Sequence, residues 1–396
     1  MKSLDSSVRR VLIYRLGSLG DTVVALPCFR LIGRAFPAAE RRLLTNFPIE
    51  AKAPATAAIL ASTGLVHGYL RYTVGVRNPL KIFHLVQEIR RFKPDVVVYL
   101  MPLRSSWSVI RDRLFFRFAG VRSIVGLPRS DEFKRRFDSQ SGSFEAETVR
   151  LARSIAALGD AQAEKLANWD LEITAEEHRR ADEVLAPLKS PLGFELGSPL
   201  RSPLGPPLKS EGSVDEPVGP LIVCGPGTKM QAKDWGQENW RALLMQMEPL
   251  YPGAVLALVG AREDASASEF VADGWRGRSV NLCGQLSPRE TAAVLARAQI
   301  FLGPDSGPMH LAASVGLPTV IAFSARGLPG VWFPVGNQHQ IVYHQIHCAG
   351  CGLEVCTTEA RRCLTTITVE EMLAAAKKVL AAAQTVMDKR LPPSPE

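Results

Sequence analysis

Short apolar runs alternate with amphipathic segments along nearly the whole chain, and this alternation restricts the fold more than any other feature. Segments 22–36 and 79–92 carry apolar residues at the period of a helix. The short runs between such segments are typical of buried parallel strands, which need a crossover helix to connect them. The sequence therefore predicts an α/β protein with doubly wound parallel sheets. The runs expected to be strands are 11–16, 41–46, 68–72, 95–100 and 123–127 in the first half, and 221–225, 254–260, 279–284, 300–304 and 319–324 in the second.

The chain of 396 residues is too long for one ordinary hydrophobic core, so two domains are expected. Segment 186–220 separates them, because it is rich in Pro, Gly and Ser, lacks periodicity and repeats Ser-Pro-Leu. We interpret it as a linker or a disordered insertion. The expected domains are both Rossmann-like, an N-terminal one over 1–185 and a C-terminal one over 221–385 that ends in an amphipathic helix. Ligands bind at the carboxyl ends of strands in such sheets, so we expect a site in those loops, in a cleft between the domains.

The formal net charge of +8 is concentrated between Arg104 and Arg136, a segment with nine basic and three acidic residues. Such a segment favours a polyanionic partner, namely nucleic acid, anionic lipid or a phosphorylated substrate. A solvated basic face without a dedicated partner is the alternative. No apolar run approaches the roughly 18 residues of a membrane span. The apolar run before Arg15 is too short for a secretory signal, which predicts a cytoplasmic protein.

The stretch "FLGPDSGPMHLAASVGLPTVIAFS" predicts a strand followed by a short helix over 307–315. Asp305 or Ser306 can cap the start of this helix, and Gly316 suits the position just after its end. The free N–H groups at the helix start form an anion site, to which the Ser306 hydroxyl and His310 can add donors. A helix that is merely well capped, with His310 satisfied in the core, is the alternative.

Two further loops follow expected strands of the second half. In "CGPGTKMQAKDW", Lys229 and Lys233 can neutralise a diphosphate as point charges, although the loop is neither a Walker A nor a GxGxxG sequence. A solvated loop is the alternative there. Glu263 and Asp264 follow the next strand, where an acid often binds a ribose hydroxyl.

In the first half, "RLGSLGDTVVALP" places two glycines and a single acid between a strand and a helix. Asp21 in this loop has two interpretations. It caps the helix, or it points into the cleft and accepts a proton.

The seven cysteines fall into two groups. Cys28, Cys224 and Cys283 lie in apolar surroundings and are expected to be core residues. In a cytosolic chain, clustering of the other four suggests a metal such as zinc more than disulfides, but their spacing is unlike a zinc finger, so reduced thiols or a redox-labile loop are the alternative. The chain contains no Asp-x-Asp, hence no obvious ligands for a magnesium-diphosphate site. The clustered cysteines are Cys348, Cys351, Cys356 and Cys363.

Three stretches taken together resemble glycosyltransferase family 9, the ADP-heptose:lipopolysaccharide heptosyltransferases. They are "VLIYRLGSLGDTVVALPCFRLIGRAFP", "GPGTKMQAKDWGQENW" and "GPDSGPMHLAASVGLPTVIAFS", and the resemblance spans most of residues 10–375. It implies the GT-B fold, with two Rossmann-like domains facing across a cleft. It also implies an inverting, metal-independent transfer of heptose from ADP-heptose to the lipopolysaccharide inner core, without a cofactor.

The resemblance assigns roles to individual residues. Asp21 matches the acid taken to be the general base, and the donor is expected to contact Lys233. Glu263 is the best match to the ribose-binding acid, with Asp264 as the alternative. The remaining donor residues are Asp305, Ser306, Gly307 and His310, and those expected near the acceptor are Gly17, Gly20, Arg135 and Arg136.

The basic segment gains a natural partner from this resemblance, because an inner core is anionic and lies at an anionic membrane. We expect Arg135 and Arg136 to grip the acceptor or to dock the enzyme peripherally on the inner face of the inner membrane, with no nucleic acid bound. Two alternatives stay open. One is a GT-B transferase for another nucleotide sugar or acceptor, and the other is a non-catalytic binder of nucleotides or nucleic acid.

Overall fold

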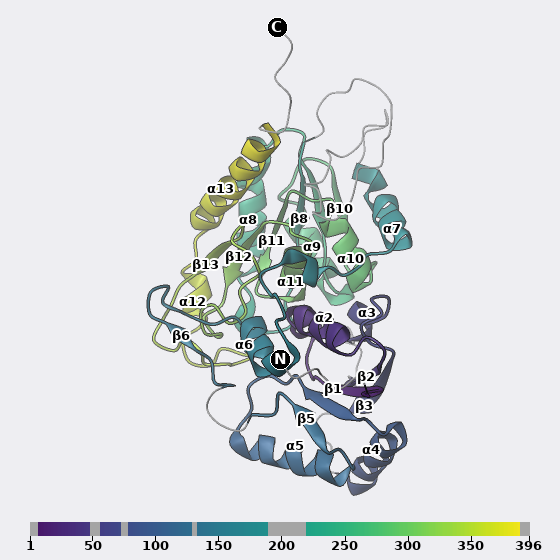
Figure 1. Ribbon diagram of the computed structural model, residues 1–396. Helices are drawn as coiled ribbons and strands as arrows, with labels where there is room; N and C mark the ends of the chain where they lie inside the picture. Colours follow the sequence, from purple (N-terminus) through teal and green to yellow (C-terminus); the bar gives the residue numbers. More distant parts are fainter. Residues whose placement is uncertain (1–6, 48–55, 73–77, 129–132, 189–218, 389–396) are drawn as a thin grey trace. The chain divides into compact units, whose positions relative to one another are not determined.

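The computed structural model describes residues 7–47, 56–72, 78–128, 133–188 and 219–388 (Figure 1). The chain forms two compact units, Met1–Glu172 and Ile173–Glu396. Segment 189–218, nearly all of the expected linker, lies outside the described residues. In the part of the chain that is described, no helix is long and apolar enough to cross a membrane.

The first unit contains a parallel five-stranded sheet in the order β3-β2-β1-β4-β5. Apolar β1 and β4 are buried at its centre, as expected for strands covered on both faces. Helices α4 and α5 pack on one face through a cluster that includes Tyr14, Ile89 and Phe116. The strands are β1 (Arg10–Tyr14), β2 (Glu40–Asn46), β3 (Gly68–Tyr72), β4 (Val96–Tyr99) and β5 (Ser123–Val125), and the helices are α1 (Leu19–Val24), α2 (Leu26–Ala35), α3 (Ala57–Leu60), α4 (Pro79–Phe92), α5 (Ser106–Phe118) and α6 (Glu147–Ser154).

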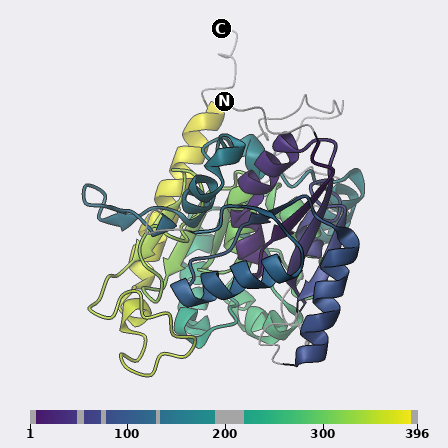
Figure 2. The ribbon, with the colours of Figure 1, turned by 60° about the horizontal axis from the view of Figure 1, so that its bottom comes forward.

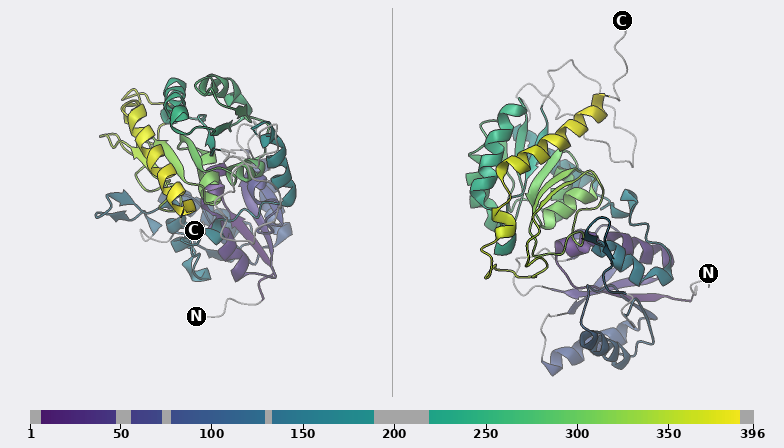
Figure 3. Two further views of the ribbon diagram at one scale, coloured as in Figure 1. Left: turned by 90° about the horizontal axis from the view of Figure 1, so that it is seen from above. Right: turned by 90° about the vertical axis from the view of Figure 1, so that its left-hand side faces the viewer.

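The second unit contains a parallel six-stranded sheet in the order β10-β9-β8-β11-β12-β13. Helix α13 packs against α8 and crosses β12 and β13 (Figure 3). The strands are β8 (Leu221–Cys224), β9 (Val255–Leu258), β10 (Ser279–Asn281), β11 (Ile300–Pro304), β12 (Thr319–Phe323) and β13 (Gln340–Tyr343), and the helices are α7 (Ala175–Leu185), α8 (Gln237–Met247), α9 (Ala265–Ala272), α10 (Pro288–Leu295), α11 (Gly307–Ser314), α12 (Arg362–Thr365) and α13 (Val369–Asp388).

All ten strands expected from the apolar runs are present, which confirms the α/β prediction. Two features escaped the pattern: edge strand β13, which is short and only half-buried, and the small antiparallel hairpin of β6 (Phe137–Asp138) and β7 (Ser143–Phe144). The helix expected over 22–36 is broken into α1 and α2 at Ala25, because Pro27 in the first turn of α2 suits a helix start better than an interior.

The boundary between the units precedes the expected one. Sequence composition put the end of the first domain at residue 185, whereas α7 belongs to the second unit. The reason is packing, because α7 lies along α10 and its Glu177 carboxylate pairs with the buried Arg289 guanidinium at 2.6 Å. Arg297 pairs with Asp182 at 2.7 Å in the same interface.

Candidate active site

In both sheets the order in which successive strands are added reverses beside the first strand of the unit. In the first unit the chain runs from β1 outward to β3 and then returns to β4 on the other side of β1. In the second it runs from β8 to β10 and returns to β11 beside β8. Open α/β sheets bind ligands at the carboxyl ends of the strands at such a reversal. Asp21 follows β1, Lys233 follows β8 and Asp305 follows β11, so the topology brings the predicted residues to these edges.

Asp21 lies at the third position of α1, whose N-cap is Ser18. Its Oδ2 accepts hydrogen bonds from the backbone N–H of Ser18 at 2.7 Å and from the Ser18 hydroxyl at 2.8 Å. Its Oδ1 lies 3.7 Å from the Arg15 guanidinium, and about a quarter of the side chain stays exposed. Asp21 is therefore part of a capping box and still offers a carboxylate oxygen to solvent.

Two neighbours hold the Asp21 loop in place. Arg15 is almost wholly buried, and its guanidinium donates to the carbonyl of Leu100 at 3.0 Å and to that of Asp21 at 2.8 Å. The N–H of Gly17 donates to the Asn46 side chain at 2.9 Å. A Cβ on Gly17 would lie 2.4 Å from that of Asp21, so only glycine fits there. Gly20, also expected near the acceptor, is buried within α1.

Lys233 and Asp305, both predicted to contact the donor, form an ion pair with 2.8 Å between Nζ and Oδ2. Lys233 ends a short 3-10 turn, Gln231–Lys233, after β8, and Asp305 follows β11 on the adjacent strand. Because the Asp305 side chain is 6% exposed and that of Lys233 17%, this lysine is held in one place rather than free in solvent.

Ser306 is the N-cap of α11, yet its hydroxyl caps nothing. The Oγ atom is buried and has no hydrogen-bond partner in the described structure. An unpartnered buried hydroxyl is costly, and here it lies at a helix start whose N–H groups favour an anion. Gly316, with φ +76°, ends the helix as expected, and His310 one turn in is buried near Trp332, with 6.5 Å between ring centroids.

The two acids after β9 differ in availability. Glu263 is exposed, whereas Asp264 is half-buried and its Oδ2 accepts the N–H of Ala261 at 2.8 Å. Burial raises the pKa of Asp264, and burial lowers the pKa of nearby Lys229, with both acids opposing that effect. Asp264 thus closes its own turn, whereas the Glu263 side chain is exposed.

Residues 348–363, which we call the cysteine segment, pack against the loop that carries Lys233. The Ala232 N–H donates to the Glu354 carbonyl at 3.0 Å, the Cys356 N–H donates to the Gln231 side chain at 2.9 Å, and Arg361 donates to the Asp234 carbonyl at 2.7 Å. Sequence reasoning missed this role, since the contacts join parts of the chain more than 100 residues apart.

All seven cysteines are free thiols. Cys348, Cys351, Cys356 and Cys363 line one small cavity, but among the described residues no three Cys, His, Asp or Glu side chains are arranged to hold a metal. Backbone N–H groups lower the pKa of the Cys356 thiol. Cys28, Cys224 and Cys283 are buried core residues as expected, and burial raises the pKa of Cys28 to about 12.

The two arginines expected near the acceptor differ in exposure. Arg135 pairs at 3.0 Å with the fully buried Glu147, which Arg150 also holds at 2.7 Å. Arg136 is exposed, and its backbone N–H donates to Glu145 at 2.9 Å. Arg135 is therefore tied to an internal ion pair, and only Arg136 of the two presents its side chain to solvent.

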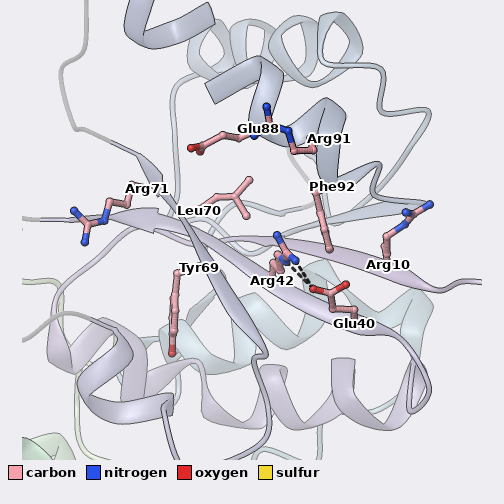
Figure 4. Close-up of a pocket in the computed structure, with 9 residues that line it drawn as sticks. All are labelled: Arg10, Glu40, Arg42, Tyr69, Leu70, Arg71, Glu88, Arg91 and Phe92. Atoms are coloured by element: carbon pink, nitrogen blue, oxygen red, sulfur yellow. Dashed lines mark hydrogen bonds and ion pairs between the residues drawn. The ribbon is translucent and has the colours of Figure 1, made fainter. Parts of the chain in front are cut away.

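A separate pocket of mixed charge lies between β2, β3 and α4 (Figure 4). Arg42 pairs there with Glu40 at 2.6 Å, and Glu88 and Arg91 of α4 also line the pocket. Arg10 and Glu40 open their strands, so this pocket lies toward the amino ends of the sheet and not at the edge that carries Asp21.

Comparison with known proteins places this arrangement in a family. A family model described as glycosyltransferase family 9 (heptosyltransferase) matches residues 114–361, more than half of the chain. The chain belongs to glycosyltransferase family 9. The resemblance predicted from three motifs is thereby confirmed, and with it the prediction of a glycosyltransferase at the level of the family.

Individual relatives of this family 9 chain were found by sequence and by structure. Lipopolysaccharide heptosyltransferase 3 of Escherichia coli is 28% identical over 105 residues, 26% of this chain and 31% of that protein, so the match spans about a third of the relative. A family 9 glycosyltransferase structure from Veillonella parvula gives a TM-score of 0.66 at 17% identity, covering 94% of this chain and 98% of that one.

Two heptosyltransferases of Escherichia coli also share the fold. ADP-heptose lipopolysaccharide heptosyltransferase II gives a TM-score of 0.58 at 17% identity over 95% of this chain and 99% of that one. Heptosyltransferase WaaC with ADP-2-deoxy-2-fluoro heptose gives 0.54 at 16% identity over 93% and 99%. These likenesses confirm the GT-B class of two Rossmann-like sheets.

Proposed function

We propose that this member of glycosyltransferase family 9 transfers a heptose from ADP-heptose to the lipopolysaccharide inner core, with inversion and without a metal ion. The observation that carries the proposal is the grouping of Lys233, Asp305 and the unpartnered Ser306 hydroxyl at the carboxyl ends of β8 and β11. The names of the relatives support the substrates, since they include lipopolysaccharide heptosyltransferase 3 and WaaC with ADP.

The donor diphosphate is proposed to bind at the start of α11. Its charge would be met by the N–H groups from Gly307 onward, by the Ser306 hydroxyl and by Lys233, while Asp305 keeps the lysine in position. Glu263 would accept the ribose hydroxyls after β9, and His310 would contact the sugar end. As the bond from the anomeric carbon to the diphosphate breaks, these donors stabilise the charge that the leaving ADP gains.

Asp21 is proposed as the general base. It takes the proton of the acceptor hydroxyl while that oxygen bonds to the anomeric carbon from the face opposite the diphosphate, which inverts the configuration. Gly17 leaves room for the carboxylate beside the loop, and the Arg15 guanidinium orients it from 3.7 Å while donating to the Asp21 carbonyl. Arg136 remains the exposed candidate for contact with the anionic acceptor, which we propose to be reached peripherally at the membrane.

The first test is Asp21→Asn. The amide keeps an oxygen that can accept from Ser18 but cannot take a proton, so we expect turnover to fall about 10²–10⁴-fold with ADP affinity unchanged. Glu290→Gln is the matched control, because Glu290 fills the same capping-box position of α10, with 2.7 Å from its Oε2 to the Ser287 N–H. Normal turnover of Asp21→Asn would contradict the general-base role and leave Asp21 only a structural role in the capping box.

The second test distinguishes the donors. Thermal unfolding is followed with ADP, UDP, GDP and NAD, each at about 100 times its dissociation constant, where a ligand adds roughly 2.7 kcal/mol. A shift with ADP alone supports the proposal. A shift with UDP or GDP instead indicates a GT-B transferase for another nucleotide sugar. No shift, together with tolerance of Asp21→Asn, would favour a non-catalytic binder.

A further inference from the structure

Helix α5 is apolar on two opposite faces. Val109 and Phe116 point toward the sheet and are buried, as folding of the unit requires. Four further apolar residues recur at intervals of three and four positions along the opposite side, which makes one continuous stripe on a helix. Their exposed fractions are 76% for Trp107, 49% for Ile110, 64% for Leu114 and 64% for Phe118. We call these four residues the α5 stripe.

The α5 stripe belongs to a larger apolar surface of the first unit. Of the thirteen large apolar side chains exposed in the described structure, eight lie between residues 80 and 118. They include Leu80 and Phe83 of α4, which covers the same face of the sheet as α5 (Figures 1 and 2). Arg90 joins the two helices, since it donates to the Phe118 carbonyl at 2.8 Å and stacks on the Phe118 ring. Burial within the unit does not explain so much clustered apolar area.

The charge around the α5 stripe has one sign. Arg111, Arg113 and Arg117 are exposed on its flanks. The single acid of the helix, Asp112, points inward, where the Tyr99 hydroxyl at 2.8 Å and Arg104 at 3.0 Å hold it. Arg111 also pairs with Asp112, at 2.9 Å, so the charges that Asp112 leaves to the flanks are those of Arg113 and Arg117. Among the described residues, no carboxylate pairs with Arg113 or Arg117. The solvent face of α5 therefore presents Trp, Leu, Ile and Phe between arginines.

We propose that the α5 stripe docks this protein on an anionic lipid surface, lying in the plane of the headgroups. A helix with aromatic and aliphatic residues on its outer side and arginines on the flanks matches the chemistry of that interface, where Trp prefers the headgroup level and Arg meets anionic lipid. Trp107 stands at the start of α5, after the carboxyl end of β4, and Asp21 follows the carboxyl end of neighbouring β1. Docking there brings the lipid beside the edge of the sheet that carries Asp21.

This inference rests on the proposed function, because it identifies the surface that makes the proposed peripheral membrane contact. Its test needs neither donor nor acceptor. The purified full chain is mixed with vesicles of phosphatidylethanolamine and phosphatidylglycerol, or of phosphatidylcholine alone, and sedimented. We expect binding to the anionic vesicles that falls at least about tenfold in Trp107→Ser/Leu114→Ser. Arg113→Gln/Arg117→Gln should lose the preference for anionic lipid. Met245→Ser/Leu250→Ser, which removes two apolar residues of the second unit that are exposed by 53% and 44%, is the control.

Fluorescence gives a second readout that locates the contact. The other five tryptophans are buried or half-buried, so a blue shift of emission on adding vesicles reports Trp107, and Trp107→Phe should abolish the shift while binding persists. Absence of vesicle binding, or equal binding by the stripe variant and the control, overturns the proposal. A dimer that the stripe variant converts to a monomer would assign the surface to a second copy and overturn it as well. Each of these failures leaves the Asp21 and ADP tests untouched.

Discussion

At the scale of single residues, the site is built from groups that the folded chain leaves only partly satisfied. Asp21 uses one carboxylate oxygen for its capping box and leaves the other near Arg15. Ser306 occupies a capping position without capping. Such residues cost stability where they stand, which is common where a protein binds a ligand.

Ser306→Ala tests the donor role of the unpartnered hydroxyl. Because Oγ has no hydrogen-bond partner among the described residues, we expect thermal stability to be unchanged or slightly raised. Loss of a hydrogen bond to a charged phosphate should cost about 1.5–3 kcal/mol of ADP binding, measured by calorimetry. Ser287→Ala is the opposite control, since the Ser287 Oγ accepts from the Glu290 N–H at 3.2 Å and its loss should cost about 1 kcal/mol of stability without affecting ADP. Equal ADP affinity in both variants contradicts the role of Ser306.

Gly17→Ala tests whether the position of Asp21 matters. The new methyl group would collide with the Cβ and Cγ of Asp21, at 2.4 and 2.7 Å, and must displace the carboxylate. We expect turnover to fall about 100-fold, the scale of a misplaced catalytic group, with ADP affinity retained. Gly33→Ala, whose methyl group would meet only Leu65 at 3.8 Å, should keep full activity. Full activity of Gly17→Ala would argue against Asp21 as the base.

At the scale of elements, the cysteine segment supports the donor loop. Arg361 has a left-handed backbone, with φ +60°, and reaches the Asp234 carbonyl next to Lys233. The Trp235 indole likewise donates to the Ile367 carbonyl at 3.0 Å, so the two residues that follow Lys233 are both tied to the segment before α13. The cysteines thus lie in a segment that supports the proposed donor site structurally.

Arg361→Gln should therefore weaken the donor site from outside it. We expect the donor KM to rise about tenfold with a smaller change in kcat, because Lys233 loses its fixed position and not its charge. Arg362→Gln is the control, since that side chain is two-thirds exposed and its ion pair with Glu359 is long, at 3.8 Å. If both variants keep the wild-type KM, Arg361 has no positioning role.

At the scale of the whole molecule, the division into two units depends on where α7 packs. Ala181 and Leu185 of α7 are buried within the second unit, and Glu177 neutralises the buried Arg289. Burial would raise the pKa of Glu177, but hydrogen bonds from Arg289 and Thr174 outweigh burial and lower it. We propose that the functional donor domain begins at residue 173.

Two truncated chains test this boundary. A chain that begins at Ile173 retains α7, whereas one that begins at Ala186 leaves Arg289 without its carboxylate. Since removing one partner of a buried ion pair costs about 3–5 kcal/mol, the shorter chain should unfold at a clearly lower temperature, followed by circular dichroism. The longer chain should retain ADP affinity. Identical melting of the two would show that α7 is not required.

The sequence by itself determined the local helices and strands and the motifs in the loops that follow the strands. Apolar runs predicted ten strands, and Gly316 and Ser306 predicted the ends of α11, because the apolar pattern of a strand and the residue types at helix ends can be read from neighbouring positions alone. The family could also be recognised from motifs, since loops after strands keep a short contiguous signature.

Only the tertiary structure decided which side chains are free. Arg135 and Arg136 are adjacent in sequence, yet Arg135 forms an ion pair with the buried Glu147 and Arg136 is exposed. The tertiary structure also pairs Lys233 with Asp305 and brings Arg361 to the loop that carries Lys233. It leaves the α5 stripe exposed. Ion pairing and burial depend on contacts between distant segments, and the local pattern of residues does not encode which of those contacts form.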